Sequence, residues 1–102
     1  MIARVWLAQS TPDRAPAYVE HLRNQVLPSI QTIDGYCGAV LLERAVGDAV
    51  ELIVITFWQS PDAIQSFAGT DLERAVVADV AAASLTQFDR SVKHYEVAVK
   101  DG

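Results

Sequence analysis

The 102-residue chain is predicted to adopt an α+β fold, because two helical patterns each follow a segment that alternates like a strand. The order of these segments is β-α-β-β-α-β, the ferredoxin-like split βαβ arrangement. A short internal echo supports this order, since Thr11-Pro12-Asp13 and Ser60-Pro61-Asp62 each stand between a strand and a helix. Right-handed crossovers then put both helices on one face of a four-stranded antiparallel sheet, with the first and last strands side by side.

The first strand and the first helix are predicted from two different periodicities. Residues 1–9 alternate between two faces, as a strand does. A helix follows, predicted from apolar residues at 3.6-residue spacing, namely Tyr18, Leu22, Val26 and Ile30. Asp13 is expected to cap this helix, and Pro28 is expected to kink or end it near Leu27. Asp34-Gly35 then supplies the turn that leads out of it.

Two further strands are predicted in the middle of the chain, over residues 36–46 and 49–58. Gly47-Asp48, which lies between them, is a hairpin signal. The second of the two is rich in β-branched residues, which favour strands: Val50, Ile53, Val54, Ile55 and Thr56. Cys37, near the start of the first, is predicted to be a small buried hydrophobe.

The second half of the chain repeats the helix-then-strand pattern. Ser60 is expected to begin a helix that Gly69 ends. Asp71 can cap another helix, and apolar residues at helical spacing and an alanine-rich run predict that this second helix extends over residues 71–85. Residues 87–100 are predicted to end in the last strand.

Composition and charge exclude several classes of function. Eight basic and 13 acidic residues give a net charge of −5, the wrong sign for electrostatic binding of nucleic acid. The single cysteine cannot form an intramolecular disulfide, and no Cys/His cluster has metal-ligand spacing. The longest apolar stretch, residues 52–58, is too short to cross a membrane, and no signal peptide is visible. We therefore expect a reduced, cytoplasmic protein with no nucleic-acid or membrane partner, no metal and no cofactor.

The strands carry apolar side chains on both faces. In residues 49–58, Leu52 and Val54 lie on one face, and Ile53 and Ile55 lie on the other. Two helices can cover only one face of the sheet, and a face in contact with water is usually polar. An apolar face left bare is larger than monomers usually expose. The sequence therefore predicts a homodimer in which two sheets pack face to face.

Four stretches of the chain carry the pattern of a known family. They are Ile2-Ala3-Arg4-Val5-Trp6, Phe57-Trp58-Gln59-Ser60-Pro61-Asp62-Ala63-Ile64-Gln65-Ser66-Phe67-Ala68-Gly69, Asp71-Leu72-Glu73-Arg74-Ala75-Val76 and His94-Tyr95-Glu96-Val97. Together they resemble the antibiotic biosynthesis monooxygenase-like family of dimeric α+β barrels. The resemblance covers almost the whole chain, which is expected to be a single domain over residues 1–102. Its most specific piece, Trp-x-Ser-x-x-Ala-x-x-x-Phe, describes a strand end, a helix cap and a helix face.

The resemblance implies several activities, and two residues of this chain argue against one of them. The family includes cofactor-independent oxygenases of polycyclic phenols, quinol oxygenases and heme-degrading members. Heme-degrading members carry a tryptophan and, further along, a heme-ligating histidine where this chain has Phe67 and Val77. No other histidine is near in sequence, and valine offers iron no ligand, so heme degradation is not expected.

His94 and Arg4 are the predicted catalytic residues. His94 titrates near neutral pH, so it can take a proton from a phenol as a general base, with Glu96 on the same strand face. Arg4 and Trp6 share a face of the first strand, and pairing with the last strand brings them near His94. An arginine beside a tryptophan can hold an enolate or phenolate by charge and stacking. The alternatives are a strand histidine bonded to a neighbour, a core Trp6 and an Arg4 ion pair between subunits.

Four aromatic residues are the predicted substrate-binding residues: Trp6, Tyr18, Phe67 and Tyr95. Tyr18 and Phe67 occupy equivalent places on the two helices and can wall a pocket, although such stripes are more often core. Tyr95 can donate from its phenol or simply pack on the sheet. His21 is expected to be a solvated helix residue, with the rim of a cavity as the alternative, and Trp58 is expected to be a packing residue.

The function implied by the resemblance is a cofactor-independent monooxygenase, or a related proton-transfer enzyme, acting on an aromatic or quinone-like small molecule. The alternative is a non-enzymatic dimeric protein that binds a small ligand or has a structural role. The enzyme hypothesis requires at least one titratable group inside an apolar cavity. The two hypotheses therefore differ in where Arg4, His21, His94 and Tyr95 point.

Overall fold

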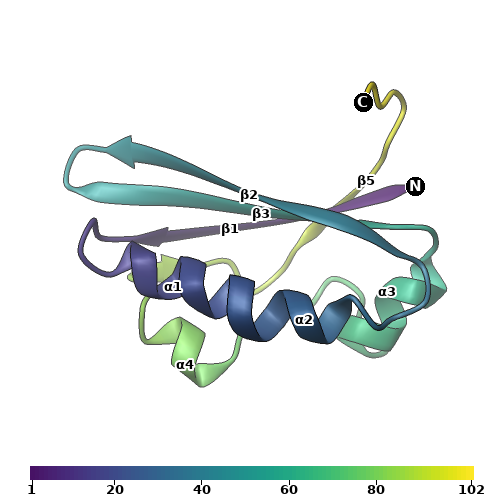
Figure 1. The fold of residues 1–102 in the computed structure, drawn as a ribbon, viewed down its shortest axis with the longest axis horizontal. Helices are drawn as coiled ribbons and strands as arrows, with labels where there is room; N and C mark the ends of the chain where they lie inside the picture. The colour runs from purple at the N-terminus through teal and green to yellow at the C-terminus, as the bar shows by residue number, and fades with distance from the viewer.

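The computed structural model describes residues 1–102 and shows an antiparallel sheet with helices packed on one of its faces (Figure 1). The strand order is β2-β3-β1, and β4 and β5 both pair with the remaining edge of β1. The predicted α+β, ferredoxin-like order is confirmed. The elements are β1 (Ile2–Ser10), α1 (Ala15–His21), η1 (Leu22–Val26), α2 (Leu27–Ile30), β2 (Tyr36–Val46), β3 (Ala49–Trp58), α3 (Pro61–Ala68), α4 (Asp79–Ala82), β4 (Gln87–Phe88) and β5 (Lys93–Glu96).

The last strand of the predicted sheet is divided into β4 and β5. Phe88 pairs with Ala8, whereas Lys93 pairs with Val5. Two residues of β1 therefore face the four residues 89–92, and the excess makes the strand bulge away from regular pairing. The bulge leaves the backbone of residues 90–92 free to bond with another segment.

The first helical stretch runs through α1, η1 and α2 without a break. Its N-cap is Arg14, which makes no side-chain cap bond, so the predicted Asp13 cap is wrong; the carbonyl of Thr11 accepts the N–H groups of Arg14 and Ala15 at 3.1 and 2.8 Å instead. The helix also continues past Pro28 to Ile30. Because proline lacks an N–H and crowds the turn before it, the wider π turn of η1 accommodates Pro28 without ending the helix.

The predicted helix over residues 71–85 is wrong. Helix α3 begins after Ser60, whose Oγ accepts the Ala63 N–H at 3.2 Å, and it ends at Gly69 as expected. Residues 70–78 then form no helix, and α4 is a single short turn. The backbone of this segment pairs with the bulge: Ala75 N–H donates to Arg90 O (2.9 Å), and Glu73 O accepts from Val92 N–H (2.8 Å). These long-range bonds replace the local bonds of a helix.

The core lies between the sheet and the helices. Trp58 is fully buried, with ring centroids 5.4 Å from Tyr36 and 5.7 Å from Phe67, so its predicted packing role is confirmed. A second cluster joins Trp6 and Tyr18 to the helix-facing side of β3. Cys37 is exposed rather than buried as predicted, because it is the extra residue of a bulge between Tyr36 and Gly38 on the edge strand β2.

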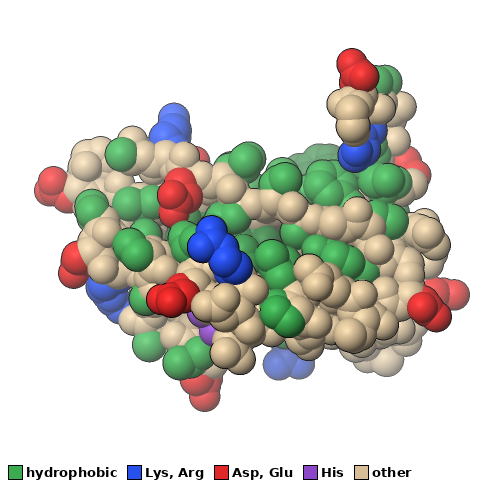
Figure 2. All heavy atoms as spheres, viewed as in Figure 1, with side chains coloured by type: hydrophobic (Ala, Val, Ile, Leu, Met, Phe, Trp, Pro, Cys, Tyr) green, Lys and Arg blue, Asp and Glu red, His purple; other side chains and the backbone are tan.

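The other face of the sheet carries apolar side chains with nothing packed on them. Leu7, Val40 and Leu42 are 38%, 42% and 47% exposed, and Tyr95 is 53% exposed. In the register of the sheet, Ile53 lies between Leu7 and Leu42. We call this the open face. Figure 2 shows hydrophobic side chains gathered along the sheet side of the molecule, away from α4.

Two glycines provide a matched test of the predicted turns. Gly35 has φ of +89°, and a Cβ there would lie 2.6 Å from the Cβ of Ala63; Gly47 has φ of +59° and no atom within 4 Å of such a Cβ. We expect Gly35→Ala to lower the free energy of unfolding by about 3 kcal/mol and Gly47→Ala by about 1 kcal/mol, because only the first adds a steric clash to the backbone strain. Urea unfolding followed by tryptophan fluorescence measures both losses. Equal losses would show that the contact with Ala63 does not constrain the first turn.

Candidate active site

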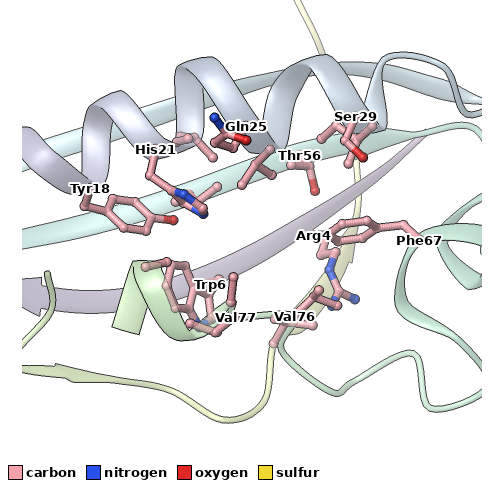
Figure 3. Close-up of a pocket in the computed structure, with 17 residues that line it drawn as sticks. Arg4, Trp6, Tyr18, His21, Gln25, Ser29, Thr56, Phe67, Val76 and Val77 are labelled. Carbon is pink, nitrogen blue, oxygen red and sulfur yellow. The ribbon is translucent and has the colours of Figure 1, made fainter. Parts of the chain in front are cut away.

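A cavity of about 310 Å³ lies between the sheet and the helices. Strands β1 and β3 form its base, the α1–η1–α2 stretch forms one wall, and residues 76–78 form the other (Figure 3). Of its 17 lining residues, 12 are hydrophobic. This volume and lining are typical of a site for a small organic molecule, at the small end of the usual range.

Arg4 gives one end of the cavity a positive charge. Its side chain is only 4% exposed, and its Nη1 and Nη2 groups donate to the carbonyls of Leu72 and Arg74, the latter at 2.7 Å. Its guanidinium also lies 5.6 Å from the centre of the Phe67 ring. No carboxylate pairs with it, because the ion pairs of the chain are Arg44–Glu51 and the N-terminus with Glu96. Burial lowers the pKa of Arg4, but an arginine stays protonated at neutral pH, so the charge remains.

His94 lies behind Arg4 rather than in the cavity. The two residues pair across β1 and β5 as predicted, and His94 Nε2 is 3.1 Å from Arg4 Nη1. Because a guanidinium only donates, Nε2 accepts and the imidazole is neutral with its proton on Nδ1. Burial and then the charge of Arg4 lower the pKa of His94, and Glu73 opposes them. His94 is not among the residues that line the cavity, so its geometry favours positioning Arg4 over removing a proton from a ligand.

Three of the predicted aromatic residues line the cavity: Trp6, Tyr18 and Phe67. Trp6 is held by a 2.7 Å hydrogen bond from its Nε1 to Asp89 O, and its ring centroid lies 5.8 Å from that of Tyr18. Burial raises the pKa of Tyr18 far above its usual value, so its hydroxyl is a neutral hydrogen-bond donor. Tyr95 lies on the open face instead, on the opposite side of the sheet from this cavity.

The cavity also contains polar residues that were not among the predicted site residues. His21, which is half-buried, lines it beside Tyr18, with ring centroids 6.4 Å apart, so the structure favours the cavity rim over a solvated position. The spacing of three residues from Tyr18 on one helix was the available signal. Thr56 lines it from β3, and its Oγ1 accepts a 2.8 Å bond from Trp58 Nε1. Gln25 and Ser29 lie on the helical wall (Figure 3).

Two further searches of the chain bear on its class. None of its helices combines the length and apolar composition that crossing a bilayer requires. No group of three or more His, Cys, Asp or Glu side chains is arranged to hold a metal ion.

The fold and the cavity define a ferredoxin-like α+β protein with a largely apolar cavity between sheet and helices. A family model described as antibiotic biosynthesis monooxygenase matches residues 1–79, and the chain belongs to this family. The family predicted from the sequence is therefore confirmed. No curated protein sequence matches the chain.

Solved structures share the fold across their length. A Bacillus cereus protein of the antibiotic biosynthesis monooxygenase type has a TM-score of 0.71 and 16% identity, covering 100% of this chain and 95% of that one. The heme-degrader MhuD from Mycobacterium tuberculosis, with two hemes in its active site, has a TM-score of 0.63 and 22% identity, covering 100% of both chains. The monooxygenase ActVA-Orf6 of Streptomyces coelicolor, in complex with nanaomycin D, has a TM-score of 0.58 and 20% identity, covering 99% and 91%. At these identities the likeness establishes the fold.

The residues expected at the heme positions do lie in this cavity. Phe67 and Val77 both line it, and neither side chain can ligate iron. The histidine that lines the cavity is His21, which reaches it from α1, on the wall opposite Val77 (Figure 3). The chain therefore lacks the ligand expected at residue 77 and has a histidine on the other wall.

The contact between Arg4 and His94 predicts a pH dependence of stability. Because the pKa of His94 is lowered in the folded state, the unfolded chain takes up a proton near pH 6.5 while the folded chain does not. The free energy of unfolding therefore has its full value above pH 6.5, and it decreases as the pH falls below 6.5. We expect His94→Gln, which keeps an acceptor for Arg4, to show a shallower decline between pH 7.5 and 5 in urea unfolding. Parallel declines in the two proteins would show that burial and the charge of Arg4 do not hold His94 neutral in the folded protein.

Proposed function

We propose that the protein is a cofactor-independent oxygenase, or a related proton-transfer enzyme, that binds an aromatic or quinone-like molecule as its anion. The observation that carries this proposal is the buried charge of Arg4, without a carboxylate partner, at one end of an apolar cavity. A buried charge favours a partner of opposite sign, and the protein supplies none. Membership of the antibiotic biosynthesis monooxygenase family and the nanaomycin D complex of ActVA-Orf6 support this class of ligand.

In the proposed reaction the protein needs only to bind the substrate and to stabilise its negative charge. The ring system of the substrate packs against Trp6 and Phe67, and Arg4 stabilises the ionised phenol or enolate, which lowers the pKa of the substrate. Molecular oxygen is the oxidant and the substrate anion supplies the electrons. A methylene carbon loses both hydrogens and gains one oxygen atom as a carbonyl, and the second oxygen atom leaves as water with those two hydrogens.

Two histidines have different roles in this proposal. His21 lines the cavity, so it is the imidazole placed to receive the proton that the substrate loses. His94 acts through Arg4, since its Nε2 accepts from the guanidinium and fixes that group against the cavity. A titratable group inside an apolar cavity is the feature that separates the enzyme from the binding-protein alternative.

Binding of an anion tests the central part of the proposal. We expect the protein to bind 2-naphthoate more tightly than the neutral 2-acetylnaphthalene, as measured by quenching of tryptophan fluorescence. Arg4→Met removes the charge, so it should weaken binding of 2-naphthoate about 10- to 100-fold and leave the neutral compound unchanged. Arg4→Lys is the matched control and should keep part of the preference. Equal binding of the anion by Arg4→Met and the unaltered protein would contradict the proposal, provided that circular dichroism shows both folded.

Catalysis is tested separately from binding. We expect oxygen uptake with 1,8-dihydroxyanthrone, a polycyclic phenol with an oxidisable methylene, and we expect His21→Gln to slow it at least 100-fold because the proton acceptor is lost. Binding without oxygen uptake would favour the ligand-binding alternative. Saturable binding of ferric heme, followed by its Soret absorbance, would instead favour a heme-dependent reaction.

The open face supports a second proposal, that two copies of the chain associate through their sheets. The side chains of Leu7, Leu42 and Ile53 form one apolar row across it. Burying such a row against an identical one removes apolar surface from water on both copies and closes the barrel expected for this family. The homodimer is therefore the assembly that we propose.

A single charge on the open face should break this dimer. We expect the protein to sediment as two chains at micromolar concentration and Leu42→Glu to sediment as one, because the carboxylate would be buried without a partner. Val80→Glu is the control, since Val80 is 67% exposed on α4, on the other side of the molecule. A mass of one chain for the unaltered protein would refute the proposal.

A further inference from the structure

The cavity has a second polar end, at the hydroxyl of Tyr18. The Tyr18 side chain is 4% exposed, and its hydroxyl points into the cavity (Figure 3). None of the side-chain hydrogen bonds of the chain involves this hydroxyl, and the one fully buried side-chain polar atom without a partner is Thr11 Oγ1, so the Tyr18 oxygen is accessible from the cavity. A ligand that enters the cavity displaces solvent from this hydroxyl, so a ligand that supplies an acceptor would gain a hydrogen bond there.

Arg4 and Tyr18 lie at opposite ends of the cavity with Trp6 between them (Figure 3). Arg4 and Trp6 are alternate residues of β1 on one face, so their Cα atoms are about 6.7 Å apart. The Tyr18 ring lies a further 5.8 Å from the ring of Trp6, measured between centroids. A ligand held by Arg4 must therefore extend across the Trp6 indole before it reaches the Tyr18 hydroxyl.

We infer that Tyr18 is a specificity-determining residue, and that the ligand carries an anionic group at one end and a hydrogen-bond acceptor, such as a carbonyl oxygen, at the other. This inference rests on the proposed function, because it takes the anion at Arg4 as given. The apolar lining between the two ends selects for rings, and Tyr18 selects among ringed anions for those that carry the distal acceptor. A plain hydrocarbon ring acid fills the same space but leaves the hydroxyl unpaired.

The chemistry of Tyr18 fits the role of donor. Burial raises its pKa, so the phenol keeps its proton throughout the neutral range. His21 stands beside it, and the two rings face the same end of the cavity. Because an imidazole can also donate, the experiment must separate the two residues.

The test uses two ligands of the same charge and similar shape, 6-acetyl-2-naphthoate and 6-isopropyl-2-naphthoate, of which only the first has a distal acceptor. The dissociation constant of each is measured by fluorescence quenching, and the ratio of the two constants is compared among variants. We expect Tyr18→Phe to shift this ratio about 3- to 12-fold against the acetyl compound, the usual effect of one hydrogen bond. Because the hydroxyl has no protein partner, the variant should melt at the temperature of the unaltered protein or above it.

Two control variants separate the possible failures. His21→Gln should leave the ratio unchanged, and a shift there with none in Tyr18→Phe would overturn the assignment to Tyr18. An unchanged ratio in both variants would overturn the distal acceptor altogether. Arg4→Met should weaken both naphthoates equally and keep the ratio. If Arg4→Met weakens neither, the anion end of the proposed function fails, whatever Tyr18→Phe shows.

Discussion

The buried guanidinium of Arg4 is the interaction on which the shape and the charge of the cavity both depend. From the first strand it donates to the carbonyls of Leu72 and Arg74, which fixes the segment that closes one wall. The same group accounts for the positive end of the cavity, because carbonyl dipoles solvate the charge without cancelling it. A structural role alone would be served as well by apolar packing, since burying an unpaired charge is costly. Its presence at a cavity is therefore the reason that we propose an anionic ligand.

The segment held by Arg4 is also where local and long-range forces compete. Its alanines and apolar spacing favour a helix, and a method that sees only neighbours in sequence predicts one. In the fold, the backbone groups of Glu73 and Ala75 bond to the bulge between β4 and β5. The guanidinium of Arg4 donates to two further carbonyls of the same segment. The sequence of the segment does not indicate those partners, because the bonded backbone groups, such as those of Ala75 and Arg90, are far apart in the chain. The strands and turns were predictable because alternation, Gly35 and the Ser60 cap act locally.

The same division explains which site residues were predictable. Arg4, Trp6 and Tyr18 follow from periodicity, because strand alternation and helical spacing put them on faces that meet. The same alternation explains why Tyr95 is not in the cavity. Because His94 faces the same side of the sheet as Arg4, the next residue, Tyr95, must face the other side. His21 was not predicted as a site residue because an isolated polar residue on a helix is usually solvated. Whether it lines the cavity depends on how wide the cavity is. That width is set by packing between segments and leaves no trace in local sequence.

The open face and the cavity are two sides of the same strands. Along β1, Arg4 and Trp6 point toward the helices, while Val5 and Leu7 point toward the open face. A strand with apolar side chains on both sides is stable as the middle layer of a structure and less so at its surface. Covering the open face with the second copy that we propose would thus hold the strand that carries Arg4. The proposed assembly and the proposed ligand site would in this way be connected through one strand, because its side chains alternate between the two faces.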